Sequence, residues 1–405
     1  MARIAIIGGG ASGLTASIYA AKKHDVTIYE RNSVCGKKIT ISGNGKCNYW
    51  NEDQSPNHYH SHEPEILKNF FDTPLKKEVE NFFETLGIFP KIKNGYYYPY
   101  SMQATSIRNT LVKKALTKGV KIIYNFFVEE IRKENNIFII NPKKEHLIFD
   151  KVILACGSMA AKKTGSDGIG YKLAKDFGHV IIKPEPTLVQ VKSDASFLKE
   201  WHGVRCETIV SLYIEEQLIC QEKGEIQLTD YGASGICIFN ISRFVKENVH
   251  AKKKINVHIN FLPEFQNFST EEIINWLDNR AKKLKEYNLE EMLEGIFPYK
   301  LLFIILKESN RKKQENWLQL NNREKRNFVE KARNFVIPII DTLDFEHAQA
   351  CSGGVSLQEI NIDTMESKKV KNLYILGELL DVDGDCGGYN LGFAWMSGIK
   401  CGKNC

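Results

Sequence analysis

Residues 3–30 decide the fold of this chain, and they read RIAIIGGGASGLTASIYAAKKHDVTIYE. Arg3 to Ile7 is an apolar run typical of a buried β-strand, Ala11 to Lys23 has helical composition, and Val26 to Tyr29 is a second apolar run. Between the first strand and the helix, Gly8-Gly9-Gly10-Ala11-Ser12-Gly13 fits the spacing G-x-G-x-x-G. The stretch therefore predicts a strand, a helix and a second strand in a β-α-β unit.

Each glycine of this turn has a physical reason to be there if the unit binds a dinucleotide. Gly8 makes the tight turn, Gly10 lets the backbone approach a pyrophosphate, and Gly13 allows the helix to pack closely on the strand. The N-terminus of the helix offers free N–H groups and a positive dipole to the phosphates. Glu30, which ends the second strand, is placed to accept hydrogen bonds from the adenosine ribose hydroxyls.

The loop that follows Glu30 favours FAD over NAD. It contains Gly36-Lys37-Lys38 and Ser42-Gly43-Asn44-Gly45-Lys46-Cys47-Asn48, which combine glycines with lysines. Such a loop can fold back over a pyrophosphate and a ribityl chain, with backbone N–H donors and ammonium groups facing anionic oxygens. The alternative is a solvated loop in which glycine only provides flexibility.

The remainder of the N-terminal region continues the same α/β pattern. Further strands are expected at Lys121 to Phe127, Ile137 to Ile140 and Lys151 to Ala155, with a helix at Ala104 to Thr117. A composition change near Pro184 marks a domain boundary.

Beyond this boundary the sequence shows two different patterns of apolar residues. Short alternating runs such as Thr208 to Ile214 and Lys254 to Ile259 predict an antiparallel β domain. From Ser269 to Phe335 apolar residues recur at helical spacing after a Ser-Thr-Glu-Glu helix start, which predicts a helical insert. A last buried strand at Lys371 to Gly377 and an apolar helix return the C-terminus to the first domain.

Composition excludes several classes of protein. The chain has 405 residues with 43% hydrophobic and 26% charged residues, and 55 basic against 49 acidic residues give a net charge of +6. This mild basicity tolerates an anionic partner without demanding one. The ten cysteines form no C-x-x-C pair, so no metal site is expected, and the longest apolar stretch, Leu301 to Leu306, is far too short to cross a membrane. We expect a cytoplasmic protein with reduced thiols.

Taken together, the motifs resemble the BaiN/RdsA family of NAD(P)/FAD-dependent oxidoreductases, which includes aminoacetone-oxidase-like flavoproteins. The resemblance covers nearly the whole chain and rests on the opening fingerprint, the two motifs after Glu30, Thr164-Gly165-Ser166-Asp167-Gly168, Gly353-Gly354-Val355, Gly377-Glu378-Leu379-Leu380-Asp381 and Gly387-Gly388-Tyr389-Asn390. It implies an α/β, Rossmann-like FAD-binding domain (1–183 and 352–405) with an inserted antiparallel, barrel-like β domain (184–262 and 336–351) and a helical insert (263–335).

The resemblance also implies a set of cofactor contacts. Gly377 and Glu378 would meet the ribityl and phosphate region, and Gly387 to Asn390 would open a helix toward the flavin ring. Val128 would meet the adenine, and residues 164–170 would form a turn near the flavin. The expected cofactor-binding residues are Gly8, Gly10, Ala11, Ser12, Gly13, Glu30, Arg31, Lys37, Lys38, Ser42, Gly43, Asn44, Gly45, Cys47, Asn48, Val128, Ala155, Gly157, Gly377, Glu378, Asp381, Gly388, Tyr389 and Asn390.

Reduction of a C=C bond also needs a proton donor beside the flavin. Cys351 and Cys386 each adjoin a glycine motif that is expected to line the flavin, and thiols at helix starts have lowered pKa values. Tyr389 and His347 are further candidates. A cysteine at either position is otherwise a small buried hydrophobe.

These features predict an FAD enzyme that is reduced by NADH or NADPH and transfers hydride to a polarised C=C bond. By the resemblance, the expected substrate is a uridine of 23S rRNA, converted to dihydrouridine, and the alternative substrate is an unsaturated steroid-like metabolite. An O2-dependent oxidase of aminoketones or amines, and a non-catalytic flavin-binding protein, are the alternatives. The basic clusters Arg311-Lys312-Lys313 and Arg323 to Arg326 are either a solvated helix face or a grip for RNA phosphates.

Overall fold

The computed structural model describes residues 1–71 and 75–405 and divides the chain into two compact units. The first unit consists of Met1–Thr187 together with Phe345–Cys405, and the second of Leu188–Asp344. The two ends of the chain therefore build one unit. This confirms the Rossmann-like α/β fold with its separate antiparallel sheets.

A seven-stranded sheet forms the centre of the first unit, in the order β21-β22-β23-β11-β1-β2-β7. Strands β23, β11, β1, β2 and β7 are parallel, and β21 and β22 add an antiparallel edge. Ile4 of β1 pairs with Val26 of β2 on one side and with Lys151 of β11 on the other. The strands are β1 Arg3–Ile7, β2 Asp25–Tyr29, β7 Lys121–Ile123, β11 Lys151–Leu154, β21 Ile360–Asn361, β22 Glu366–Ser367 and β23 Leu373–Ile375.

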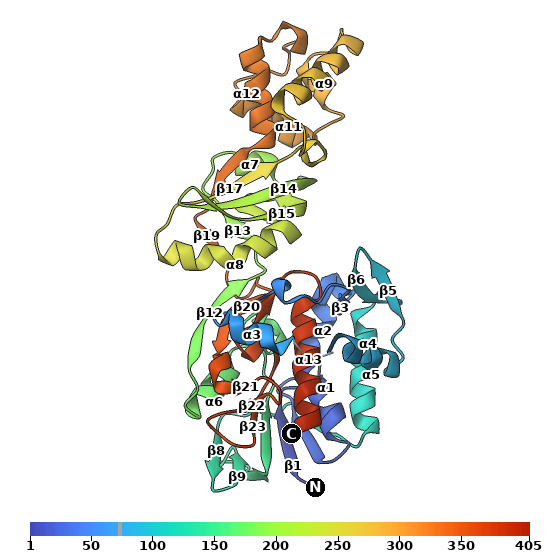
Figure 1. Ribbon diagram of the computed structural model, residues 1–405, viewed down its shortest axis with the longest axis vertical. Coiled ribbons are helices and arrows are strands. Elements are labelled where there is room, and N and C mark those ends of the chain that lie inside the picture. Colours follow the sequence, from blue (N-terminus) through green and yellow to red (C-terminus); the bar gives the residue numbers. More distant parts are fainter. Residues whose placement is uncertain (72–74) are drawn as a thin grey trace. The chain divides into compact units, whose positions relative to one another are not determined.

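Two helices pack together beside this sheet, α1 (Ala11–Ala20) and α13 (Tyr389–Asn404). Their close contact depends on glycine: a Cβ on Gly398 would lie 2.7 Å from the carbonyl oxygen of Ser12, and one on Gly402 would lie 2.5 Å from that of Ala16. Figure 1 shows α13 along α1, with the two termini near each other. This packing places the first turn of α1 against Gly398, in the middle of α13.

Three predicted elements are shorter than expected, for local backbone reasons. The helix from Ala11 ends at Ala20 and not at Lys23. The strand from Lys121 ends at Ile123, because Asn125 turns the chain with a φ of 55°, although the amide of Phe126 still bonds the carbonyl of Glu30. The last strand begins at Leu373, directly after Asn372 with a φ of 67°.

Smaller sheets and helices surround the central sheet of the first unit. The sheets are β10-β9-β8, β12-β20, β24-β4 and β3-β6-β5. Their strands are β3 Trp50–Asn51, β4 Tyr59–His60, β5 Pro90–Lys93, β6 Tyr96–Pro99, β8 Ile131–Glu134, β9 Ile137–Ile140, β10 Leu147–Phe149, β12 Ile181–Thr187, β20 Ala350–Val355 and β24 Asp383–Gly384. The remaining helices are α2 Lys37–Ile41, α3 Pro64–Phe70, α4 Leu75–Thr85, α5 Ala104–Thr117 and α6 Ile169–Asp176.

The second unit is built on another seven-stranded sheet, in the order β18-β17-β14-β15-β16-β13-β19. Its edge strands β18 and β19 are joined by only Ile339 and Ile340, and the amide of Ile340 bonds the carbonyl of Lys192, so the sheet curls toward a barrel-like form. Helix α8 (Ile236–His250) packs on this sheet. The strands are β13 Val191–Lys192, β14 Arg205–Ile214, β15 Gln217–Leu228, β16 Gly232–Gly235, β17 Ile255–Asn260, β18 Phe335–Pro338 and β19 Asp341–Thr342.

The predicted helical insert lies within this second unit and shares its hydrophobic core. It contains α9 Thr270–Lys283, α10 Leu289–Leu293, α11 Tyr299–Glu308 and α12 Asn322–Arg333, and the short α7 Leu198–Trp201 precedes β14. Helix α9 begins with a capping box in which Ser269 and Glu272 bond each other's backbone amides, as the Ser-Thr-Glu-Glu start indicated.

The boundaries between the units differ from those expected. Residues 184–187 and 345–351, which we assigned to the β domain, lie in the first unit. The reason is a strand pairing: β12 runs antiparallel to β20, with Thr187 opposite Ala350 and Pro186 opposite Cys351. The chain leaves the first unit directly after β12 and returns to it shortly before β20.

Candidate cofactor site

The fingerprint turn has the geometry that its glycines indicated. Gly8 has a φ of 106°, and a Cβ there would lie 2.5 Å from the carbonyl oxygen of Ala155. A Cβ on Gly13 would lie 2.1 Å from the carbonyl oxygen of Gly8, so only glycine lets α1 approach β1 this closely. In contrast, a Cβ on Gly10 would meet no atom within 4 Å. The start of α1 therefore faces open space at Gly10.

Glu30 is buried at the end of β2, and backbone amides fix its carboxylate. Its Oε2 accepts a hydrogen bond of 2.9 Å from the amide of Gly9, and its Oε1 accepts two bonds of 2.8 Å from the amide and side chain of Asn32. A carboxylate offers about four acceptor positions, so this arrangement leaves room for a ribose hydroxyl.

The turn at 164–168 lies against the end of β2. The guanidinium of Arg31 pairs with Asp167 at 2.6 Å and donates to the carbonyl of Gly165 at 3.3 Å, and the side chain of Asn32 donates to that of Thr164. Arg31 therefore serves mainly to tie this turn to the strand. Val128 is buried in the segment that follows β7, and Gly157, with a φ of 74°, packs against the hydroxyl of Ser166.

Four distant segments meet beside the first turn of α1. The ammonium of Lys38 in α2 lies 2.6 Å from Glu378 Oε2, and the same oxygen accepts a bond of 3.1 Å from Ser158 Oγ. A Cβ on Gly377 would lie 2.8 Å from Ser12 Oγ. The motifs at 8–13, 36–48, 155–168 and 377–381, separated by up to about 370 residues, thus lie together beside the first turn of α1.

The loop after α2 is mostly exposed and strongly turned. Residues Ser42–Gly45 form a short 3-10 turn in which Gly43 and Asn44 have φ values of 54° and 53°. Cys47 is buried, and burial raises the pKa of its thiol to about 12, so it acts as a packed residue. Ala155 and Lys37 complete this region, the first buried behind the fingerprint and the second exposed.

Asp381 is the expected cofactor residue whose carboxylate is already occupied by protein groups. It is fully buried and accepts hydrogen bonds from the hydroxyl of Ser61 and the amide of His62, both at 2.8 Å, and its other oxygen lies 2.9 Å from His62 Nδ1. These contacts give Asp381 a structural role at the base of the 381–390 segment.

At the start of α13, hydrogen bonds from Asn51 and Asn390 hold the glycine loop 386–388 and the residues next to it. Asn390 accepts a bond from the amide of Gly384 and donates to its carbonyl, at 2.9 and 2.7 Å. Asn51 of β3 donates to the carbonyl of Gly387 at 3.0 Å. Gly388 has a φ of 93° and is the last residue before Tyr389 opens the helix.

Several buried polar atoms of this region lack a hydrogen-bond partner among the described residues. They are Asn48 Oδ1, Trp50 Nε1 and Arg108 Nε. Asn48 and Trp50 lie against Gly388, and the Arg108 side chain lies against Gly36. Buried donors and acceptors without partners are costly, and the phosphates and polar flavin edge of FAD would supply the missing ones. The residues present therefore fit this cofactor.

Arg108 and Trp50 were missed by the sequence analysis. Arg108 lies in the middle of helix α5 with no motif around it, and Trp50 follows Asn48 in a two-residue strand. Neither position carries a local signal, because each becomes part of the site only through tertiary packing.

Replacing Arg108 by alanine is expected to weaken FAD binding about tenfold, because a cation beside the Gly36 loop would be lost. Quenching of flavin fluorescence on titration of the apoprotein measures this. Arg132→Ala, which removes an exposed arginine paired with Glu130, is the matched control and should bind FAD as the parent does. Equal affinity of the Arg108 variant and the parent would remove Arg108 from the site.

The four proton-donor candidates differ in their surroundings. Cys351 is buried in β20, and burial raises the pKa of its thiol to about 11 despite a hydrogen bond with Ser158 and the nearby Lys38 ammonium. The expectation of a lowered thiol pKa is wrong for Cys351, because it lies in a strand and not at a helix start. Cys386 is half-buried directly before Gly387. Burial also raises the pKa of Tyr389. His347 is exposed.

A cluster of histidines and aspartates next to Tyr389 was also missed. His58, His60 and His62 alternate along one segment, and Asp381, Asp383 and Asp385 alternate along another. The alternation itself was the available signal, since side chains at every second residue of a strand share one face.

The described residues contain no group of three or more histidine, cysteine, aspartate or glutamate side chains arranged to hold a metal ion. Among the helices of the same residues, none combines the length and apolar character needed to cross a membrane.

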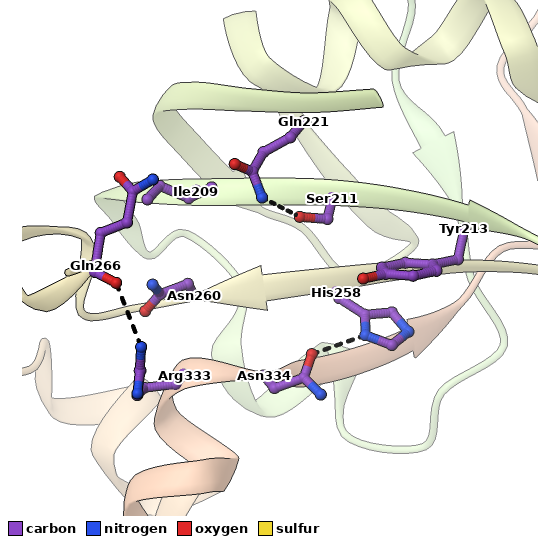
Figure 2. A pocket seen from close by; sticks show the side chains of 9 residues that line it. All are labelled: Ile209, Ser211, Tyr213, Gln221, His258, Asn260, Gln266, Arg333 and Asn334. Carbon is purple, nitrogen blue, oxygen red and sulfur yellow. Dashed lines mark hydrogen bonds between the residues drawn. The ribbon is translucent and has the colours of Figure 1, made fainter. Parts of the chain in front are cut away.

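The second unit carries a polar pocket of about 220 Å³. Figure 2 shows its nine lining side chains, which come from β14, β15 and β17, from the segment before α9 and from the end of α12. Arg333 is its one cation, none of the nine is a carboxylate, and Tyr213 and His258 pack ring to ring at 4.2 Å.

The sequence matches the family described as "HI0933-like protein Rossmann domain" over residues 2–404. It is 37% identical to a 3-dehydro-bile acid delta(4,6)-reductase of Clostridium scindens, over 100% of this chain and 98% of that protein. It is 27% identical to a ribosomal RNA dihydrouridine synthase of Haemophilus influenzae, over 98% of this chain and 96% of that protein.

Among solved structures, the fold is similar to that of 3-ketosteroid delta1-dehydrogenase from Sterolibacterium denitrificans. The TM-score is 0.51 at 11% identity, over 99% of this chain and 98% of that one. At this identity the similarity concerns the fold alone.

Proposed function

We propose that this chain, which belongs to the HI0933-like family, reduces a C=C bond conjugated to a carbonyl group. The proposal starts from its enzyme class, since members of this family are FAD-dependent oxidoreductases and this chain is one of them. The names of both relatives support this reaction. A delta(4,6)-reductase acting on a 3-dehydro compound and a synthase of dihydrouridine each saturate a double bond that is conjugated to a carbonyl. One chemistry thus accounts for both relatives.

The reaction adds a hydride to the carbon β to the carbonyl and a proton to the α carbon. FAD, when bound and reduced, supplies the hydride. The chain supplies the rest: the amides at the start of α13 and their dipole favour negative charge nearby, and Lys38 and Glu378 hold the 36–48 loop to the 377–381 segment. We propose NADH or NADPH as the reductant.

We propose a small steroid-like enone as the substrate. The relative with the higher identity, 37% over full length, is named for such a molecule. The basic clusters that suggested RNA are largely neutralised inside the second unit. Arg311 pairs with Glu324 at 2.8 Å, Lys313 with Glu290 at 3.3 Å, Lys325 with Asp278 at 2.8 Å, and Arg326 with Glu271. These arginines and lysines therefore have less charge to offer to RNA phosphates.

A uridine of ribosomal RNA is the second candidate substrate. The pocket in Figure 2 favours it, because Arg333, four side-chain amides and no carboxylate line it. Such a donor-rich surface suits phosphate and base oxygens. If RNA is the substrate, Arg333→Glu should weaken RNA binding and leave reduction of a small enone unchanged.

The test is oxidation of NADH or NADPH by the purified holoenzyme under anaerobic conditions. We expect oxidation to depend on a 3-keto-4-ene or 3-keto-4,6-diene steroid, with a product heavier by two hydrogens per bond reduced. Turnover only with an rRNA fragment would favour the second candidate. Flavin reduction by an aminoketone, with O2 as the acceptor and no need for NADH, would instead establish an oxidase.

Cys351→Ala is expected to lower enone reduction about 100-fold while FAD remains bound, if this thiol gives the proton. It contacts Ser158, whose hydroxyl bonds Glu378. Because its pKa is raised to about 11, the thiol stays protonated throughout the neutral range, and its contribution is lost only in strongly alkaline solution. Cys386→Ala tests the second thiol, and Cys206→Ala, in the second unit, is the control. Parental rates in both Cys351→Ala and Cys386→Ala would exclude cysteine as the donor.

A further inference from the structure

Two short segments of the first unit, far apart in the sequence, form a strip of alternating histidines against alternating aspartates. Residues 58–62 read HYHSH and residues 381–385 read DVDGD. They run antiparallel through β4 and β24, with Asp383 opposite His60 and Gly384 opposite Tyr59. The strip lies directly before the glycine loop 386–388 and the start of α13.

One carboxylate in this strip joins two imidazoles. Asp385 Oδ2 lies 3.0 Å from His58 Nδ1, and Asp385 Oδ1 lies 2.9 Å from His60 Nε2. The other ring nitrogen of His58 lies 3.1 Å from Asp53 Oδ2. We call His58, His60 and Asp385 the histidine clasp. Its side chains are 32%, 25% and 20% exposed, so water reaches them only in part.

The clasp touches the candidate flavin loop at both of its ends. The ring of His58 stacks on that of Tyr389, with centroids 4.5 Å apart and planes inclined by 18°. Tyr59 meets the same ring edge-on at 5.6 Å. At the other end, the amide of Asp385 bonds the carbonyl of His58 at 2.9 Å. Both ends of the loop between Asp385 and Tyr389 therefore contact the same histidine.

We propose that Asp385 is a positioning residue that, through protonated His58, holds the loop Gly387–Tyr389 in the conformation that binds FAD. The inference rests on the flavin site and not on the identity of the substrate. A neutral His58 can keep only one of its two carboxylate partners as a hydrogen-bond acceptor, because neutral imidazole has a single N–H. A protonated ring donates to Asp385 and to Asp53 together.

The charges around the clasp set the direction of its response to pH. His58, at the end of a short turn before β4, faces Asp53 after β3, Asp385 after β24 and Tyr389 on α13. Tyr59, the next residue, also meets the Tyr389 ring. Lys76 of α4 is the cation near Asp53, and Tyr96 of β6 lies near Tyr389. Burial alone lowers the pKa of His58, but the hydrogen bonds with Asp385 and Asp53 outweigh it and raise the pKa. Burial alone raises the pKa of Asp385, but bonds with His60 and His58 lower it.

These two directions define when the clasp is strong. The contribution of His58, whose folded pKa is raised, is full below its ordinary pKa of 6.5 and is lost as the pH rises through the folded pKa. That of Asp385, whose folded pKa is lowered, is present above 3.8 and lost as the pH falls through the folded pKa. The clasp is therefore strongest in weakly acidic solution and weakens as the pH rises through the folded pKa of His58.

The experiment is a titration of the full-length apoprotein with FAD at a series of pH values, followed by flavin fluorescence. We expect the parent to bind about tenfold less tightly above the His58 transition than below it. NMR of the His58 ring in the apoprotein should show the same transition. In Asp385→Asn the affinity in weakly acidic solution should fall about tenfold, and the pH step should be lost or moved to lower pH.

Two further variants keep the test decisive. His58→Gln removes the proton without removing the carboxylate, and it decides the outcome if Asp385→Asn does not fold. His202→Gln, which removes a histidine 3.7 Å from Asp230 in the second unit, should leave both affinity and pH step unchanged. FAD binding by the parent without a pH step, or parental affinity of Asp385→Asn and His58→Gln at every pH, would overturn the proposal. Neither readout involves an enone, so this failure is separate from failure of the proposed reaction.

Discussion

Alanine in place of Gly10 is expected to weaken FAD binding by about 10- to 100-fold without destabilising the apoprotein. The backbone of Gly10 has a φ of −81° and a ψ of −163°, which any residue adopts. A Cβ there would touch no protein atom within 4 Å. The only thing it would meet is a ligand that approaches the backbone at the start of α1, where a pyrophosphate is expected.

The Gly10→Ala variant distinguishes an effect on FAD binding from an effect on folding, because we expect it to change the FAD affinity and not the stability of the apoprotein. Thermal unfolding of the apoprotein should match the parent, and flavin fluorescence should report the lost affinity. Gly224→Ala, at which a Cβ would make only ordinary contacts of 3.8 Å or more in the second unit, is the matched control. A Gly10→Ala protein that retains FAD through gel filtration would contradict the placement of the pyrophosphate.

The second large effect is expected at Gly388, directly before α13. Its φ of 93° disfavours any side chain, and a Cβ there would lie 2.9 Å from backbone atoms of Trp50 and 3.0 Å from Asn48 Oδ1. Backbone atoms cannot move aside cheaply. We expect Gly388→Ala to lower the free energy of unfolding by about 3 kcal/mol, since strain and overpacking add, and to abolish FAD binding. Denaturant unfolding of the apoprotein measures the first effect.

Gly45→Ala distinguishes backbone strain from collision. Gly45 has a φ of 77°, but a Cβ there would meet nothing within 4 Å. Its alanine variant should therefore lose only about 1 kcal/mol. Equal losses at Gly45 and Gly388 would show that the close packing of the glycine loop on Trp50 contributes nothing to stability.

The elements that the sequence predicts best are those whose signals are local. The G-x-G-x-x-G turn after Arg3–Ile7 is confirmed as a tight turn between β1 and α1, because glycine spacing and strand composition are properties of adjacent residues. The family resemblance and the α/β class are likewise confirmed. The Ser269 capping box is confirmed for the same reason, since its partners are three residues apart.

What could not be predicted depends on partners distant in the sequence. The clusters around Arg311 and Arg326 looked like free positive charge, but their carboxylate partners come from other helices and loops of the same unit. Arg108 joins the candidate site only because α5 packs beside the Gly36 loop. Asp385 meets His58 across 327 residues of sequence.

The boundary of the β domain shows the same limit. The residues around Cys351 have the composition of the β domain, yet they pair with β12 in the first unit. Strand composition indicates that a segment is extended, but it does not say which strand lies beside it. Cys351 also lies next to Ser158, which the spacing of the motifs alone did not indicate.

The central claim is that the holoenzyme delivers hydride and a proton to a C=C bond conjugated to a carbonyl. Its most direct test is a single turnover in deuterated water without oxygen, in which reduced holoenzyme is mixed with a 3-keto-4,6-diene steroid and the product is analysed by mass spectrometry. We predict reoxidation of the flavin together with a saturated bond that carries one solvent deuterium on each of its two carbons, because the hydrogen on N5 of a reduced flavin exchanges with water before its transfer. Reduced flavin that persists beside unchanged steroid, and beside an rRNA fragment tested in the same way, would contradict the account.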